Sequence, residues 1–175
     1  MKEFSNALEK LGVECKLVKD SDYSRGFPNK NFNDWFFGNK EFKKLINEFS
    51  PDAIFVDKQS HFGAAAIDAK IPLFVLLRGH YWSELEYAKE TMYKTKKMRA
   101  IVLLRDRIAK KCFRNATAIL PICNYLNNIV SSRYPNKRVT TLYQGIDPDK
   151  WFKWSDYYNN NYLTFDEFKN NIILS

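Results

Sequence analysis

The chain has 175 residues, a formal net charge of +8 and an isoelectric point near 9.3. Hydrophobic residues make up 45% and charged residues 27%, which excludes a disordered or low-complexity chain. The longest apolar run, residues 71–77, is far shorter than the ~20 residues that a membrane-spanning helix needs. The first residues contain no apolar stretch typical of a signal peptide. Cys15, Cys112 and Cys123 are spaced too widely for a disulfide framework or a zinc site, which favours buried free thiols in a cytoplasmic protein.

The first 50 residues predict two helices with a strand and a loop between them. Apolar residues at helical spacing predict a helix over residues 1–11, ended by Gly12. Alternating apolar and charged residues then predict a strand over residues 13–18. Residues 21–38 are polar and aromatic and predict a loop, and residues 41–49 predict a helix. Three aromatic residues of the loop are expected to fill the core beneath it, with exposed rings that stack on sugars as the alternative: Trp35, Phe36 and Phe37.

From residue 53 onward, predicted strands and helices alternate with short connections. Strands are predicted over residues 53–56, 73–77, 117–120 and 139–143, and helices over residues 61–69, 84–97, 99–114 and 124–134. The continuously apolar strand at residues 73–77 is typical of parallel sheets. This alternation predicts an α/β fold with a Rossmann-like, doubly wound parallel sheet. Ligands of such sheets bind beyond the carboxyl ends of the strands.

Four segments around these strands resemble motifs of the family 4 glycosyltransferases. They are residues 51–63 ("PDvV…H…g"), 71–82 ("iPvv.t.H"), 116–123 ("ad.ii.vS") and 138–147 ("v.vipnGvD"). Their order and spacing agree with the family. The resemblance covers the chain from Pro51 to about Trp151. It implies one half of the GT-B fold, in which two Rossmann-like domains face a cleft, and this chain is similar to the N-terminal, acceptor-binding half.

The resemblance also implies what is missing. The family's first strand and its Gly-rich loop should precede the helix at residues 1–11, and we find neither. Residues 1–151 would form an incomplete N-terminal, acceptor-side glycosyltransferase domain. Residues 152–175 would form a linker and the start of the donor domain. The family's E-x7-E motif is not found in a donor-domain context, and Gln144 stands where the family has Asn. We therefore expect these residues alone to lack transfer activity.

The implied activity is that of a retaining, hexosyltransferase-like enzyme. It would move a glycosyl group from a nucleotide-sugar to a saccharide or lipid-linked acceptor. The nucleotide-sugar would bind through the missing C-terminal domain, with no cofactor and no metal in this half. The expected location is cytoplasmic, with peripheral attachment at the inner membrane face as an option. A dinucleotide-dependent enzyme is disfavoured because no G-x-G-x-x-G follows a strand.

The candidate site residues follow the predicted strands. His80 is the candidate catalytic residue, with a hydrogen bond to sugar hydroxyls or to developing charge as its role and a plain surface histidine as the alternative. Arg78 suits phosphate or carboxylate, or forms a salt bridge with a nearby acid. His61 starts a helix, where it would face ligand oxygens or stand exposed beside a capping Ser60. The turn at Gly145 and Asp147 completes the candidate substrate-binding set, with a plain turn as the alternative.

The segment from Lys89 to Arg114 is strongly basic. It contains ten basic residues and only two acidic ones, with apolar residues interleaved. The favoured interpretation is a solvated helix face, followed by an anionic membrane surface, and nucleic acid is disfavoured. The segment supports an alternative function for the chain, a non-catalytic basic module that binds anionic membrane or nucleic acid.

Overall fold

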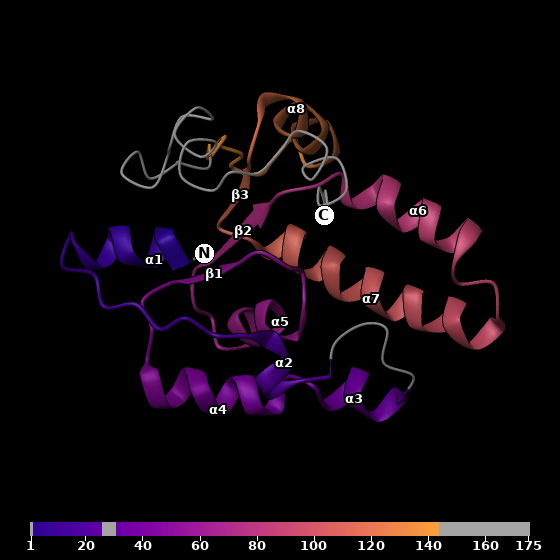
Figure 1. Cartoon of the computed structure of the whole chain (residues 1–175), viewed down its shortest axis with the longest axis horizontal. Helices are drawn as coiled ribbons and strands as arrows, with labels where there is room; N and C mark the ends of the chain where they lie inside the picture. Colours follow the sequence, from indigo (N-terminus) through magenta and orange to yellow (C-terminus); the bar gives the residue numbers. More distant parts are fainter. Residues whose placement is uncertain (1, 26–30, 144–175) are drawn as a thin grey trace, which may run out of the picture. The chain divides into compact units, whose positions relative to one another are not determined.

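The computed structural model describes residues 2–25 and 31–143, which belong to one compact unit of the chain. The predicted domain at residues 152–175 lies outside the described residues. Figure 1 shows the elements. The helices are α1 (Lys2–Glu9), α2 (Asp20–Tyr23), α3 (Phe32–Phe37), α4 (Lys40–Phe49), α5 (His61–Asp68), α6 (Tyr81–Thr91), α7 (Lys96–Asn115) and α8 (Asn124–Arg133). The strands are β1 (Ile54–Val56), β2 (Leu73–Leu77) and β3 (Ala118–Pro121).

The three strands form a parallel sheet in the order β1-β2-β3. Ile54 is the register partner of Leu73, and Phe74 is the register partner of Ala118. Beyond β3, Val139 makes a single parallel bridge to Ile119. The predicted α/β class with a parallel sheet is therefore confirmed. The predicted strand at residues 139–143 is reduced to this bridge and its neighbouring hydrogen bonds, such as that from the Leu142 amide to the Pro121 carbonyl.

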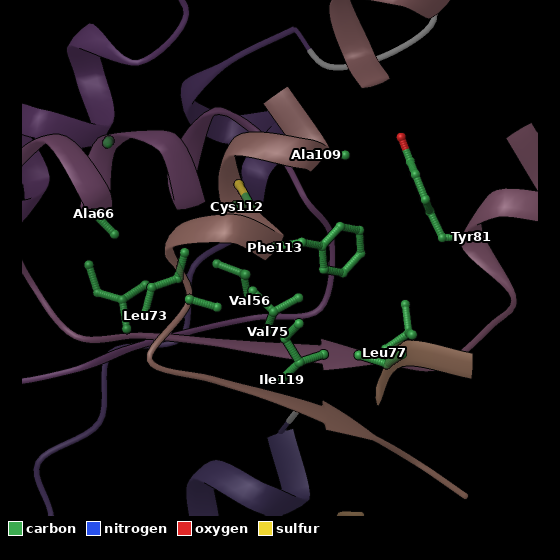
Figure 2. Close-up of a cluster of buried hydrophobic side chains, with 14 of the residues drawn as sticks. Val56, Ala66, Leu73, Val75, Leu77, Tyr81, Ala109, Cys112, Phe113 and Ile119 are labelled. Atoms are coloured by element: carbon green, nitrogen blue, oxygen red, sulfur yellow. The ribbon is translucent and has the colours of Figure 1, made fainter. Parts of the chain in front are cut away.

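One face of the sheet carries the main core. Because side chains alternate along a strand, Val56, Val75 and Ile119 share a face, and α5 and α7 contact the sheet there. Figure 2 shows these side chains beneath Cys112 and Phe113 of α7. Most of the buried cluster comes from residues 54–130, and α4 adds Phe42 and Ile46.

The opposite face of the sheet carries a ladder of aromatic rings. Phe55 of β1 stacks on Phe74 of β2 with ring centroids 4.7 Å apart. Phe4 of α1 lies 5.4 Å from Phe55, so α1 packs on this face. The predicted N-terminal helix is thus confirmed in type, although it ends at Glu9.

Small residues let α5 lie close to α7. A Cβ atom added at Gly63 would lie 2.8 Å from Sγ of Cys112, which is closer than real contacts allow. Cys112 is fully buried, and burial raises the pKa of its thiol to about 12. The prediction of a buried free thiol is confirmed for Cys112, whereas Cys15 and Cys123 are free but half-buried.

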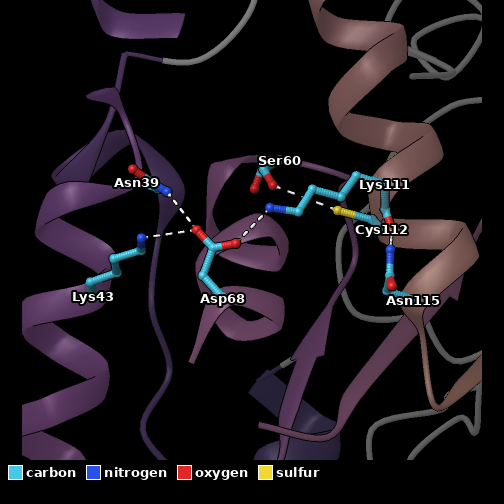
Figure 3. A network of polar contacts seen from close by, with 7 residues as sticks. All are labelled: Asn39, Lys43, Ser60, Asp68, Lys111, Cys112 and Asn115. Carbon is cyan, nitrogen blue, oxygen red and sulfur yellow. Dashed lines mark hydrogen bonds and ion pairs between the residues drawn. The ribbon is translucent and has the colours of Figure 1, made fainter. Parts of the chain in front are cut away.

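A polar network joins three helices at the end of α5. Asp68 accepts hydrogen bonds from Lys111 of α7 at 2.6 Å and from Asn39, beside α4, at 3.1 Å. Lys43 of α4 forms an ion pair with it at 2.9 Å (Figure 3). The Lys111 and Lys43 ammonium groups lower the pKa of the Asp68 carboxyl. The two lysines offset the cost of an acidic group at a helix C-terminus.

Residues 13–18 do not form the predicted strand. After the Val13 amide, which donates to the Leu8 carbonyl, no amide of residues 14–19 donates to the backbone of the described residues. Leu11, Val13 and Leu17 are largely exposed. The alternating pattern predicted a strand wrongly because a strand needs a hydrogen-bonded neighbour, which the pattern does not specify.

The predicted loop at residues 21–38 contains α2 and α3. Asn31 caps α3 by accepting a hydrogen bond from the Asn33 amide. Of the three loop aromatic residues, Trp35 is buried as expected. Phe36 and Phe37 are 66% and 71% exposed, so their placement in the core was wrong. A helix turns only one face to the core, and Trp35 takes that face.

The starts of α6 and α7 also differ from the prediction. His80 Nδ1 accepts a hydrogen bond from the Ser83 amide, so α6 starts at Tyr81, three residues before the predicted Glu84. Thr95 caps α7 by accepting a hydrogen bond from the Met98 amide. Both helices start where a side chain satisfies a free backbone amide.

Candidate functional site

The carboxyl ends of β1 and β2 bring together Asp57 and Arg78. Arg78 Nη2 lies 2.6 Å from Asp57 Oδ2. The side chains are 46% and 31% exposed, so the pair reaches solvent. The structure thus contains the salt bridge that the sequence left as the alternative for Arg78. A guanidinium has five N–H donors, and this single contact leaves others able to meet a phosphate or a carboxylate.

His80 follows β2 and is fixed as a helix cap. Its Nδ1 accepts the Ser83 amide at 3.0 Å, so Nε2 carries the ring hydrogen and can donate it. The half-buried ring packs edge-on against Trp82 at 5.9 Å and lies 6.3 Å from the ring of Tyr125. A preorganised N–H donor therefore stands at the end of the central strand.

Polar and aromatic residues of α8 continue this edge beyond β3. Asn124 Oδ1 accepts hydrogen bonds from the hydroxyls of Thr141 and Tyr143, both at 3.1 Å. Asn127 donates to the Thr141 hydroxyl at 2.9 Å. Tyr125 is 67% exposed. An exposed tyrosine offers an apolar ring face and a polar hydroxyl to a ligand.

Sequence reasoning missed Tyr125 and Tyr143. Neither is among the candidate site residues named from the sequence, although Tyr125 follows the predicted strand at residues 117–120 closely enough to be considered. Tyr143 was taken as the end of a strand, which hid its hydrogen bond to Asn124. Gly145 and Asp147, the other predicted substrate-binding residues, lie outside the described residues.

His61 is buried in the helical layer. Ser60 caps α5 by accepting the Phe62 amide, as the sequence allowed, but His61 is only 6% exposed. Its ring lies 5.6 Å from that of Trp35, and Gly38 leaves room for it. Burial lowers the pKa of His61, against the charge of Asp34. His61 Nε2 has no hydrogen-bond partner among the described residues, and its ring contacts are with α3 rather than with Arg78 or His80.

A hollow of about 910 Å³ runs along the outer edge of β1. Residues 12–21 line one side and residues 49–58 line the other. It contains Asp20, whose pKa is raised by burial and by the charge of Asp57, while a hydrogen bond with Ser60 acts in the opposite direction. A carboxyl with a raised pKa in a hollow is a functional-site candidate. The sequence offered no signal for it, because Asp20 fell between a wrongly predicted strand and a predicted loop.

The described residues lack two features that would point to a particular function, a metal site and a membrane-spanning helix. No three His, Cys, Asp or Glu side chains of residues 2–25 and 31–143 are grouped so that they could hold a metal ion. Over the same residues, no helix is both long and apolar enough to cross a bilayer.

No model of a known protein family matches the chain, and no curated protein matches it. The functional argument therefore rests on the residues at the strand ends.

Proposed function

We propose that this chain is the acceptor-binding half of a nucleotide-sugar-dependent, retaining glycosyltransferase of the GT-B fold. The proposed acceptor is a saccharide or a lipid-linked saccharide, and the proposed location is cytoplasmic. The parallel sheet flanked by helices is compatible with the Rossmann-like domain that this proposal requires. The motif resemblance between Pro51 and Trp151 supplies the reaction class.

One observation carries the proposal: hydrogen-bonding and aromatic side chains meet at the carboxyl ends of the strands. His80 lies beside the exposed ring of Tyr125, and Arg78 pairs with Asp57 at the end of the neighbouring strand. Saccharides present hydroxyls around an apolar C–H face, and these side chains complement both. Ligands of open parallel sheets bind at this edge.

Each residue has a distinct proposed role. The Tyr125 ring covers the apolar face of a sugar, as exposed aromatic rings do at binding sites. His80 Nε2–H donates to a hydroxyl of the sugar or to charge that develops during transfer. Arg78, held by Asp57 at 2.6 Å, presents its remaining donors to an acidic or phosphorylated acceptor group.

Saccharide binding by the 175-residue chain tests the proposal. A panel of methyl glycosides and N-acetylhexosamines is titrated by saturation-transfer NMR, and at least one is expected to bind saturably. Affinity should change little between about 50 and about 200 mM salt, unlike polyanion binding. Tyr125→Ala and His80→Asn are each expected to weaken binding about fivefold or more, the value of one net hydrogen bond or ring contact.

Two controls separate binding from folding. Tyr87→Ala removes a tyrosine of α6 that is 65% exposed, much like Tyr125, and should leave binding unchanged. His80→Ala removes the cap of α6 and should cost about 1 kcal/mol of stability, whereas Asn at this position caps well. Equal saccharide binding by the Tyr125→Ala, His80→Asn and parent proteins would contradict the proposal.

The alternative is a non-catalytic basic module, and the specific observation in its favour is the charge of α7. The two functions predict different salt dependence: saccharide binding at the strand ends changes little with salt, whereas polyanion binding by α7 falls steeply. Steep polyanion binding that Arg99→Glu with Arg107→Glu abolishes, with no saturable saccharide, would favour the module.

A further inference from the structure

The long helix α7 exposes a stripe of basic residues along one side. The stripe recurs at intervals of three or four residues, the spacing of one helical face. Its members are Lys96, Arg99, Leu103, Arg107, Lys110 and Arg114, all of them exposed. At 1.5 Å per residue, the 20 residues of α7 extend the stripe over about 30 Å.

The core fixes the direction in which the stripe faces. Val102, Ala109 and Phe113 of α7 are buried against the sheet and its neighbouring helices. Figure 1 shows α6 beside α7, joined to it by a short turn. Because the opposite side of α7 is buried in the core, the basic side faces solvent.

Few acidic groups of the described residues offset the stripe. Lys110 pairs with the buried Asp106 at 2.7 Å. No carboxylate of the described residues forms an ion pair with the other four cations of the stripe, which are Lys96, Arg99, Arg107 and Arg114. The exposed acids of α6 are Glu84, Glu86 and Glu90. The stripe therefore keeps a net positive charge.

Apolar side chains lie exposed among these charges. Leu103, in the middle of the stripe, is 61% exposed, and Met92, in the turn before α7, is 65% exposed. Leu103 and Arg99 line a hollow of about 590 Å³ together with Lys89, Lys94 and Glu90. Leaving a large apolar side chain in water forgoes the free energy of burial, so this surface suits a partner with an apolar phase.

We propose that this α7 surface docks on an anionic lipid bilayer, with the helix parallel to the membrane plane. Lysine and arginine contact lipid phosphates, while Leu103 enters the interface. A polybasic surface binds anionic lipid through charge, and one inserted apolar side chain adds the free energy of its burial. Nucleic acid would match the charge but offers no apolar phase for Leu103. The inference uses the same charge of α7 that favours the alternative function, commits its partner to an anionic bilayer, and does not depend on saccharide binding.

Vesicle sedimentation of the 175-residue chain tests the inference. We expect binding to vesicles with about one third phosphatidylglycerol in phosphatidylcholine, and little binding to phosphatidylcholine alone. One basic residue contributes about fivefold to such partitioning, so Arg99→Glu with Arg107→Glu should weaken it at least about 20-fold. Leu103→Asn should weaken it about tenfold, near the low end for leucine burial.

The matched control reverses two exposed lysines outside α7. Lys10→Glu with Lys40→Glu lowers the net charge from +8 to +4, the same change as in the stripe variant. This control should retain most of the vesicle binding, and circular dichroism should show that all the variants fold. Equal losses in both double variants would overturn the inference. It would also be overturned if Leu103→Asn bound vesicles normally while the parent chain bound duplex DNA as tightly as vesicles.

Discussion

His61 shows how packing alone determines the chemistry of one side chain. The sequence places it after a strand and at the start of a helix, where a ligand role was reasonable. In the structure, Trp35 and Gly38 enclose the ring, and burial lowers the pKa of His61. The sequence could not reveal this, because the enclosing residues belong to a segment predicted as a loop.

The lowered pKa predicts how stability depends on pH. Below the ordinary histidine pKa of about 6.5, the unfolded chain binds a proton at His61 more readily than the folded protein does. The free energy of unfolding therefore falls as pH drops below about 6.5 and continues to fall down to the folded pKa. We expect the free energy of unfolding to be lower at pH 5.5 than at pH 7.5, as measured by urea denaturation, with a contribution from His61 of at most about 1.4 kcal/mol, the limit for one group over the one pH unit below 6.5.

His61→Phe provides the control, since it keeps a ring beside Trp35 and removes the titration. The loss between these two pH values should be smaller in this variant. If the parent chain and the variant lost the same free energy, the decrease would come from other groups and the assignment to His61 would be wrong.

The sequence predicted a strand or helix well where the spacing of its own apolar residues was enough to define it. β2 has the predicted bounds, and β1, β3, α4, α5 and α8 each differ from prediction by one residue or so at an end. The predictions failed where pairing with another segment decides whether a strand forms. Residues 13–18 alternate like a strand but have no neighbouring strand among residues 2–25 and 31–143, and within the same residues only Val139 of the last predicted strand forms a bridge.

The crossing of α5 and α7 gives a prediction at the scale of elements. Gly63→Ala would place a methyl group 2.8 Å from the buried Cys112 Sγ. Overpacking costs about 1–3 kcal/mol, while alanine gains up to about 1 kcal/mol in helix propensity. We expect a net destabilisation of about 1–2 kcal/mol, measured by urea denaturation.

A double-mutant cycle with Cys112→Ala isolates this contact. Removing Sγ makes room for the methyl group, so Gly63→Ala should be neutral or stabilising in the Cys112→Ala background. A coupling energy above about 1 kcal/mol is expected for residues in direct contact. Additive effects would mean that the helices move apart without strain.

At the scale of the whole sheet, the order of the strands determines which residues reach the candidate site. Parallel strands in sequential order bring Asp57, Arg78 and Asn124 to one edge, and the sequence predicted that edge from strand ends alone. It could not predict that His80 caps α6 or that Tyr125 lies near its ring. Those contacts depend on how the helices begin.

The outer side of β1 provides the last prediction, which concerns hydrogen exchange. The Ile54 amide donates to the Pro72 carbonyl, and in a parallel ladder alternate residues face the same neighbour. The amides of Ile54 and Val56 therefore point toward β2, whereas the amide of Phe55 points to the opposite side, along the hollow. Amides without a protected hydrogen bond exchange through small local openings, and those of central strands require global unfolding.

We expect a period-two pattern by NMR-detected exchange. The amides of Ile54 and Val56 should exchange slowly and that of Phe55 fast, and residues 14–19 should be as fast as Phe55, since none of their amides donates to the described backbone. The amides of β2, between two strands, should be the slowest and serve as the internal reference. Slow exchange at Phe55 together with slow exchange across residues 14–18 would contradict this. It would mean that residues 13–18 pair with β1 in solution, as their alternating pattern predicted, and that the hollow is filled by the chain's own strand.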